Sequence, residues 1–178
     1  MRLFYAVAAD AEVRAAAAAV VSRLRRAPGD YRWVDPRDMH LTLRFLGETP
    51  EERLPEVEAL MRRAAAAAAP FEIVLGGAGA FESPESPRVV WLGLDEGREP
   101  MERLADALGR DEERPFSPHL TLGRNRRTSA PPGFVAALRA VPPLGLRRRV
   151  DRISLYASRP APFGHAYEVL SEAALGAP

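Results

Sequence analysis

Short apolar blocks alternate with polar segments along the chain, and their periods predict a mixture of strands and helices. The apolar run at 3–8 is typical of a buried strand. Asp10 then stands where a helix N-cap belongs, and the alanine-rich segment 11–26 favours a helix. By the same criteria, further strands are expected at 31–34, 71–75, 89–94, 150–157 and 166–170, and further helices at 99–108 and 132–140.

One more helix is predicted between 50 and 69. Thr49 is suited to cap it, Pro50 suits its first position, and the two acidic residues that follow suit its first turn. Pro55 must then lie early in this helix or force it to restart, because proline has no backbone N–H to donate.

One strand-like segment occurs twice, as His40-Leu41-Thr42-Leu43 and as His119-Leu120-Thr121-Leu122. The two histidines stand 79 positions apart and are two of only 3 in the chain. Alternation along a strand places the leucines in the core and the histidine and threonine of each copy on the opposite face. Continued further, strict alternation adds Phe45 to the core face and Arg44 to the polar row.

Arginines follow the second copy at positions 124, 126 and 127. Strict alternation places Arg124 on the leucine face, so it reaches the polar face only if the strand ends or bulges at Gly123. The three side chains can form a solvated turn or contact phosphate at the mouth of a groove. His165 is expected at the surface, and the arginines at 147–149 are expected at a solvated strand entry.

The two halves of the chain share a rough order of elements. Each has an apolar strand, around Phe4 or Trp91, followed by a helix, a loop and the His-Leu-Thr-Leu strand. This order predicts two related α+β lobes, each contributing one histidine row to a shared groove.

Composition limits the classes of function. At 178 residues and 47% apolar residues, the chain suits one compact domain, and we expect a single domain over 1–178. The net charge of +1 gives no global attraction to nucleic acid, so phosphate must meet a local cluster of the 25 basic residues, all of them Arg. The absence of Cys excludes disulfides, thiolate nucleophiles and cysteine-based zinc sites.

No uncharged apolar stretch approaches the ~18 residues of a membrane span, so we expect no membrane partner. The apolar N-terminal run is interrupted by Asp10 and Glu12 before it reaches the length of a signal peptide. We therefore expect a cytoplasmic protein that acts as a monomer.

The paired histidines suggest acid–base chemistry. Imidazole exchanges protons near neutral pH, so one histidine can serve as general base and the other as general acid. The hydroxyls of Thr42 and Thr121 could donate to phosphoryl oxygens. Two histidines, with only Asp38 near one of them, make a poor zinc site, and we expect no metal and no cofactor.

The extended motifs make the resemblance to a family specific. The blocks at 40–48 and 116–124, with Arg2-Leu3-Phe4, Trp33-Val34, the segment 155–158 and the strand at 167–170, resemble the 2H phosphoesterase superfamily. Within it, the chain is similar to the RNA 2′,3′-cyclic phosphodiesterases once described as 2′-5′ RNA ligases. This resemblance implies a bilobal α+β fold with two pseudo-symmetric antiparallel-sheet lobes, helices outside and a central groove.

The resemblance also implies residue roles. His40 would donate a proton to the leaving 3′-oxygen, and His119 would accept one from the attacking water, leaving a 2′-phosphate. Thr42, Thr121 and Arg124 would bind the phosphoryl group. Sequence symmetry alone would allow the acid and the base to be exchanged.

The implied partner is RNA or an oligonucleotide with a 2′,3′-cyclic phosphate end, and ligation through a 2′-5′ link is related chemistry. Two alternatives remain at this point. The same site could act on another small cyclic phosphate or a 2′-5′ oligonucleotide, or the protein could be a non-catalytic module that binds RNA ends.

Overall fold

The computed structural model describes residues 1–110, 115–161 and 164–177, and within these ranges the strands form one curled antiparallel sheet. The strands are β1 (Arg2–Ala8), β2 (Tyr31–Trp33), β3 (His40–Glu48), β4 (Phe71–Glu82), β5 (Pro87–Glu96), β6 (Leu120–Asn125), β7 (Leu146–Val150), β8 (Arg152–Ala161) and β9 (Gly164–Ala174). The helices are α1 (Ala11–Leu24), η1 (Pro36–Asp38), η2 (Glu51–Arg53), α2 (Leu54–Ala66), α3 (Arg98–Ala107) and α4 (Pro132–Arg139).

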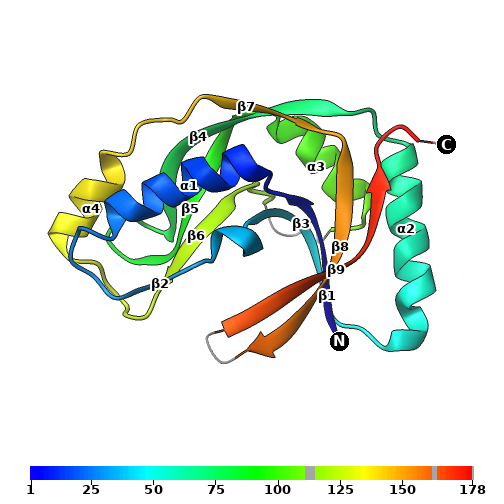
Figure 1. The fold of residues 1–178 in the computed structure, drawn as a ribbon, viewed down its shortest axis with the longest axis horizontal. Coiled ribbons are helices and arrows are strands. Elements are labelled where there is room, and N and C mark those ends of the chain that lie inside the picture. Colours follow the sequence, from blue (N-terminus) through cyan, green and yellow to red (C-terminus); the bar gives the residue numbers. More distant parts are fainter. Residues whose placement is uncertain (111–114, 162–163, 178) are drawn as a thin grey trace.

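The strand order divides the sheet into two lobes. Along the sheet the order is β7-β4-β5-β6-β3-β1-β8-β9, and β2 pairs separately with β6. The first lobe contains β3, β1, β8 and β9, and the second lobe contains β7, β4, β5 and β6. Figure 1 shows the two lobes diverging. Between the lobes, the described register consists of one pair, Leu41 with Leu120. This pair lies directly beside the two motif histidines, so the seam of the sheet positions them.

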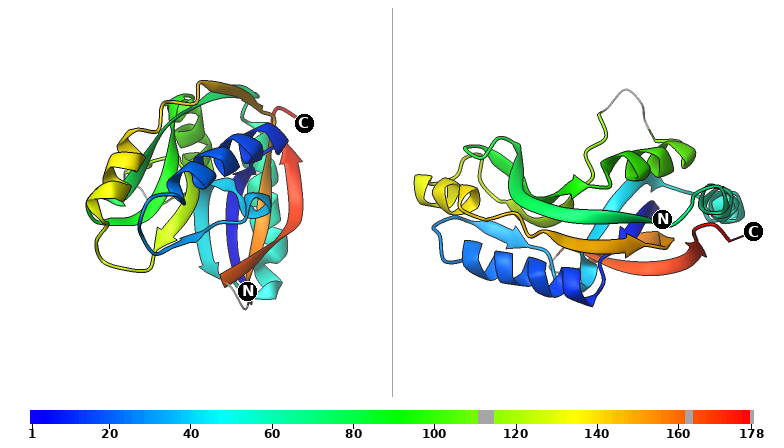
Figure 2. Two further views of the ribbon diagram at one scale, coloured as in Figure 1. Left: turned by 60° about the vertical axis from the view of Figure 1, so that its left-hand side comes forward. Right: turned by 90° about the horizontal axis from the view of Figure 1, so that it is seen from above.

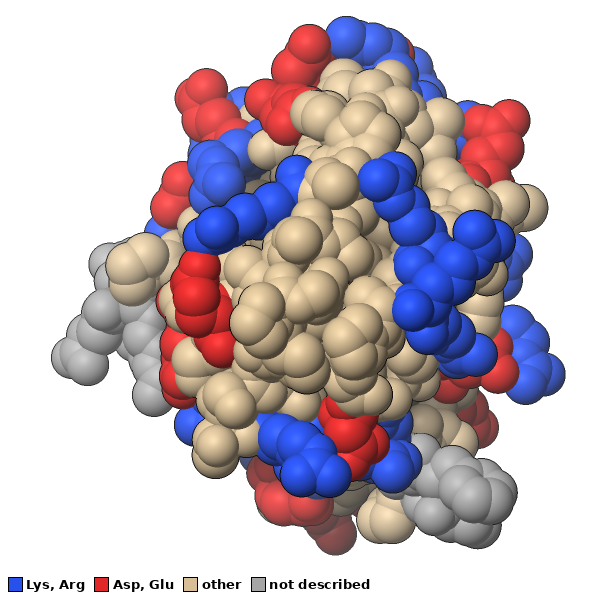
Figure 3. All heavy atoms as spheres, turned by 90° about the vertical axis from the view of Figure 1, so that its left-hand side faces the viewer, with Lys and Arg blue, Asp and Glu red and all other residues tan. Residues whose placement is uncertain are grey.

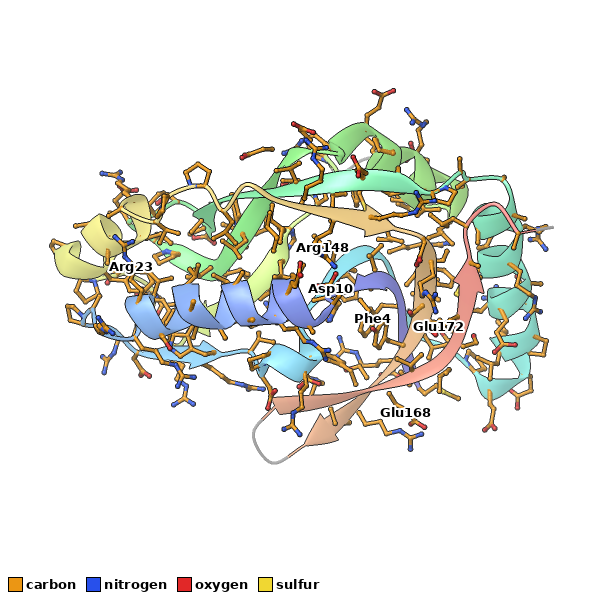
Figure 4. The ribbon with its side chains drawn as sticks, turned by 45° about the horizontal axis from the view of Figure 1, so that its top comes forward. Phe4, Asp10, Arg23, Arg148, Glu168 and Glu172 are labelled. Carbon is orange, nitrogen blue, oxygen red and sulfur yellow. The ribbon has the colours of Figure 1, made fainter. Side chains whose placement is uncertain are left out.

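α1 and α3 each pack against the lobe formed mainly by the other half of the chain. α1 comes from the first half of the chain but packs against the second lobe, where Arg148 Nε on β7 donates to Asp10 Oδ2 at 2.6 Å (Figure 4). At its other end, Arg23 Nη2 donates to the carbonyl of Ala140, just after α4, at 2.9 Å. α3 and α1 lie on opposite sides of the molecule in the view from above in Figure 2, and both contribute to the same buried core. It packs against β3 of the first lobe, and the carbonyl of Leu108 at its end accepts from Arg44.

The buried side of the sheet forms one continuous core through both lobes. Tyr5 on β1 is fully buried there, and its hydroxyl donates to the carbonyl of Val57 on α2 at 2.7 Å. Phe4, Ala6 and Tyr156 form a second, smaller buried cluster on the other face. Both faces of β1 are therefore covered, which explains its nearly uninterrupted apolar sequence.

The predicted cap of α1 is confirmed, since Asp10 Oδ1 accepts from the backbone N–H of Val13 at 3.0 Å. The helix predicted from Pro50 does not run unbroken, and the restart that Pro55 allowed is confirmed. A 3₁₀ turn occupies 51–53, and α2 begins at Leu54 with Pro55 in its first turn. The Thr49 hydroxyl donates back to the carbonyl of Gly47 rather than capping the helix.

Two strand predictions require correction. β4 and β5 are longer than expected and form a hairpin paired as far as Glu82 and Pro87. Gly79 permits this pairing because a Cβ there would lie 2.3 Å from the Trp91 ring. The arginines at 147–149 lie within a separate strand, β7, rather than before one, and β8 begins after Asp151.

None of the helices in the described ranges is long and apolar enough to cross a membrane.

Candidate active site

Each His-Leu-Thr-Leu strand carries a one-residue bulge at the same place in the motif. On β3, Tyr5 pairs with Arg44 and the next residue, Ala6, pairs with Thr42, so Leu43 is the extra residue. On β6, Val90 pairs with Gly123 and Trp91 pairs with Thr121, so Leu122 is extra. A bulge reverses the alternation of side chains beyond it. The face of the sheet carrying His40, Thr42, His119 and Thr121 is called the site face below.

The bulge in β3 overturns the expected positions of Arg44 and Phe45. Phe45 was expected in the core, but it pairs with Phe4, lies with it on the site face and is 69% exposed. Arg44 was expected in the polar row, but it pairs with the buried Tyr5 and donates to the carbonyl of Leu108. Strict alternation fails here because Leu43 occupies one position without a partner across the ladder.

The bulge in β6 brings Arg124 to the site face. Arg124 pairs with Val89, two residues from Trp91, and Trp91 pairs with Thr121. Residues two apart on β5 point to the same side, so their partners Arg124 and Thr121 do so as well. The conditional prediction of a bulge around Gly123 therefore holds.

The His40 ring is fixed by a backbone bond and by aromatic neighbours. Its Nδ1 lies 2.6 Å from the carbonyl oxygen of Asp38. A carbonyl only accepts hydrogen bonds, so Nδ1 carries the proton and, in neutral imidazole, Nε2 is the free basic atom. The ring centroid lies 4.8 Å from that of Phe4, 5.7 Å from that of Tyr156 and 5.2 Å from that of Tyr167.

His119 is held in the same way in the other lobe. Its Nδ1 lies 2.6 Å from the carbonyl oxygen of Ser117, which again leaves Nε2 as the free ring nitrogen. The Phe81 ring meets it edge-on at 4.7 Å, and Trp91 lies 6.4 Å away. Both imidazoles therefore present the same atom from equivalent positions in the two halves.

Both histidines are neutral at pH 7 in the free protein. Burial lowers the pKa of His40 to about 4; the bond to Asp38 opposes the shift, and the charge of His119 adds to it. Burial also lowers the pKa of His119, with the bond to Ser117 opposing and the nearby Arg124 guanidinium adding. The electrostatic effect of each charge indicates that His40, His119 and Arg124 share one site.

The threonines complete the site across the seam. The pair Leu41–Leu120 sets the antiparallel register, and one residue further in either direction it places His40 opposite Thr121 and Thr42 opposite His119. Among the residues that the structure describes, neither threonine hydroxyl has a hydrogen-bonding partner. Each is therefore available to a ligand held between the histidines.

The other candidate residues do not join the site. Arg126 and Arg127 are exposed and lie 3.8 and 3.9 Å from Asp30, which favours the solvated-turn interpretation for them. Arg147 and Arg148 form ion pairs on β7, and His165 is exposed. Across the described ranges, no three His, Cys, Asp or Glu residues are grouped so that they could hold a metal ion.

Sequence reasoning missed several residues of the site face. Phe81, Tyr156 and Tyr167 contact the histidine rings, and Arg32 on β2 pairs with Arg124. The alternation of Tyr31, Arg32 and Trp33 could have predicted that Arg32 points away from the core. The aromatic neighbours come from β4, β8 and β9, and no local pattern connects those strands with the histidine motifs.

Charge is spread in small groups over the surface. Figure 3 shows the end of the molecule that carries α4 and the C-terminal end of α1, where basic side chains surround a largely uncharged centre with acidic ones among them. This distribution agrees with a net charge of +1 and leaves phosphate attraction to individual arginines.

Comparison with known proteins gives consistent matches. The 2′-5′ RNA ligase superfamily matches residues 12–160. The RNA 2′,3′-cyclic phosphodiesterase of Thermus thermophilus is 40% identical over 191 residues, covering 98% of this chain and 90% of the relative. That of Thermotoga maritima is 33% identical over 180 residues, covering 97% and 94%.

Solved structures agree over almost the whole chain. The crystal structure of TT0787 of Thermus thermophilus superposes with a TM-score of 0.83 at 38% identity, covering 99% of this chain and 98% of that one. E. coli LigT complexed with 3′-AMP superposes with a TM-score of 0.77 at 30% identity, covering 98% and 97%. The expected α+β fold of two antiparallel lobes is confirmed.

Proposed function

Because the chain belongs to the 2′-5′ RNA ligase superfamily, we propose that it is an RNA 2′,3′-cyclic phosphodiesterase that opens the cyclic end to a 2′-phosphate. One observation carries the proposal: two histidines face each other's threonines across the seam, each with Nδ1 bound to a backbone carbonyl and Nε2 free. Such a pair can take a proton on one side of a phosphorus atom and give one on the other.

In the proposed reaction, His119 Nε2 takes a proton from water as the water oxygen attacks phosphorus. The bond from phosphorus to the 3′-oxygen breaks, and His40 Nε2 gives a proton to that oxygen. The product carries a 2′-phosphate and a 3′-hydroxyl, and the two histidines have exchanged protonation states. A second proton exchange with solvent restores the site.

Arg124 supports the assignment of His119 as the base. Its positive charge lowers the pKa of His119 and so keeps that ring neutral and able to accept a proton. His40 must be protonated to act as the acid, although burial alone lowers its pKa to about 4. The negative charge of a bound cyclic phosphate beside His40 would raise this pKa, because an opposite charge favours the protonated form.

Thr42, Thr121 and Arg124 would bind the non-bridging oxygens of the phosphoryl group. Donors already aimed at the developing negative charge stabilise the transition state without reorganising. A 5′-hydroxyl of a second RNA in place of water would form a 2′-5′ link by the same proton transfers. The abundance of water favours hydrolysis over this reaction.

The test is hydrolysis of a short RNA ending in a 2′,3′-cyclic phosphate, with EDTA present, by the native protein, His40→Ala and His119→Ala. We expect the native protein to convert the cyclic end to a 2′-phosphate end, and each variant to lose about 10²–10⁴-fold of this activity. Loss of native activity in EDTA would contradict the metal-free reaction. RNA binding without turnover would instead favour a binding module or another cyclic phosphate as substrate.

A further inference from the structure

Arg32 and Arg124 stand directly opposite each other on neighbouring strands. β2 pairs with β6 so that Tyr31 meets Asn125, Arg32 meets Arg124 and Trp33 meets Gly123. The Tyr31 and Trp33 rings lie 4.0 and 6.4 Å from the ring of the buried Phe134, on the core side. Alternation then places Arg32 on the opposite side, with Arg124 on the site face.

This pair of like charges has no compensating acid among the described residues. Both side chains are exposed, and neither has a carboxylate within ion-pair distance there. Other arginines nearby are paired: Arg126 lies 3.8 Å from Asp30, and Arg2 lies 3.9 Å from Glu48. Like charges directly opposite each other in a sheet are unfavourable, and an anion between them would reverse the sign of the interaction.

The pair extends from the histidine site to the other lobe. The charge of Arg124 adds to the lowering of the pKa of His119 by burial. Burial raises the pKa of Tyr167, and the charges of Arg124 and Arg32 both oppose that rise. Tyr167 belongs to β9 and its ring touches that of His40. Arg32 therefore faces the site from β2, the strand next to the β6 strand that carries Arg124. Neighbouring strands in a sheet lie about 4.7–4.9 Å apart.

We propose that Arg32 binds the phosphate that joins the terminal nucleotide to the rest of the RNA, so that the site prefers an oligonucleotide to a mononucleotide. The inference rests on the proposed function, in which Arg124 meets the cyclic phosphate itself. The next phosphate along the chain needs a cation beside Arg124. A guanidinium offers the planar pair of donors that suits phosphate oxygens. A nucleoside 2′,3′-cyclic phosphate has no second phosphate and would leave Arg32 without this partner.

The experiment compares two substrates, adenosine 2′,3′-cyclic phosphate and the dinucleotide ApA ending in the same cyclic phosphate. Native protein, Arg32→Ala and Arg63→Ala are assayed for kcat/KM on both. Arg63 on α2 is a matched control, because it is also exposed and has no carboxylate partner among the described residues. Thermal melting of each variant tests folding.

We expect Arg32→Ala to lower kcat/KM for the dinucleotide by about tenfold or more relative to its effect on the mononucleotide, the usual cost of a lost bond to a charged group. The decrease of kcat/KM with salt for the dinucleotide should become less steep, as one phosphate contact is lost. Arg63→Ala should leave the ratio between the substrates unchanged. Melting of Arg32→Ala should match or exceed that of the native protein, since like-charge repulsion is removed.

An equal loss on both substrates, or a ratio no different from that of Arg63→Ala, would overturn the assignment of Arg32. If native protein hydrolyses neither substrate, the proposed function fails, and Arg32 is judged by binding instead. ApA ending in a 2′-phosphate and adenosine 2′-phosphate are then titrated into native protein and Arg32→Ala. A selective loss of dinucleotide binding would support the phosphate contact, and an equal change for both ligands would refute it.

Discussion

Phe45 and Arg124 occupy equivalent positions in the two halves of the site: each follows its motif histidine by five positions, and each reaches the site face beyond a one-residue bulge. The backbone is thus repeated while the side chains differ, with a phenyl ring in one lobe and a guanidinium in the other. The Arg124 cation lies beside one histidine alone, and burial lowers the pKa of the other, so the two imidazoles are electrostatically unequal. The proposed division into acid and base further requires that bound phosphate raise the pKa of His40.

Replacement of Arg124 should change the titration of His119. Burial and, beside it, the charge of Arg124 lower the pKa of His119, so in Arg124→Gln that pKa should rise. The acidic limb of the pH profile of kcat/KM, on which the base loses its neutral form, should then move to higher pH. NMR titration of the His119 ring in both proteins measures the same shift directly.

Arg126→Gln is the control, because Arg126 is exposed and lies near Asp30 instead of the site. It should leave the His119 titration where it is in the native protein. A pKa of His119 that stays fixed or falls in Arg124→Gln would show that the guanidinium does not act on the ring.

The bulge in β3 leads to a second prediction, which concerns the free energy of unfolding. Leu43 is 3% exposed and Phe45 is 69% exposed, although strict alternation would bury both. Leu43→Ala should therefore lower the free energy of unfolding by about 2–5 kcal/mol, the usual cost of a cavity in a core. Phe45→Ala should cost less than about 1 kcal/mol, as expected of an exposed position. Urea unfolding of both variants measures the difference, and equal costs would place Phe45 in the core after all.

The threonine hydroxyls give a third prediction. Valine has nearly the shape of threonine, so Thr42→Val and Thr121→Val remove the hydroxyl and little else. If each hydroxyl binds the phosphoryl group in the transition state, kcat should fall by about 10²-fold in each variant. Melting temperatures should change little, because neither hydroxyl has a hydrogen-bonding partner among the described residues. Thr128→Val, at an exposed position, serves as control, and a kcat for Thr42→Val no lower than that of this control would remove Thr42 from the site.

The sequence predicted those features of the site that depend on a single strand, and it did not predict those that depend on a neighbouring strand. Alternation within a single strand predicts that His40 and Thr42 share one face of the sheet, and that His119 and Thr121 do so as well. In the structure all four residues lie on the same face. Phe45 was misplaced because a bulge depends on the neighbouring strand as well as on its own sequence. The same uncertainty left Arg124 conditional until the pairing of β6 with β5 was known.

The exchange of helices between lobes lay further beyond sequence reasoning. Nothing near Asp10 indicates that its partner is Arg148, which lies 138 positions away. The sequence allowed the restart of the helix at Leu54, because the effect of Pro55 on the backbone is local. The aromatic rings that contact the two histidines come from strands far away in the sequence, so no local pattern predicted them. Local chemistry was therefore predictable, and tertiary pairing was not.

Desolvation of the half-buried His40 ring predicts how stability depends on pH. Its pKa is about 4 in the folded protein and about 6.5 when unfolded, so the unfolded chain binds more protons between these values. The stability from the neutral ring is complete above about pH 6.5 and is lost as pH falls towards 4. Between pH 7.5 and 5, urea unfolding should show about 2 kcal/mol less acid destabilisation in His40→Gln than in native protein. His165→Gln, which removes an exposed ring, should behave as native. Equal acid sensitivity in His40→Gln and native protein would contradict the desolvated, neutral state of the His40 ring.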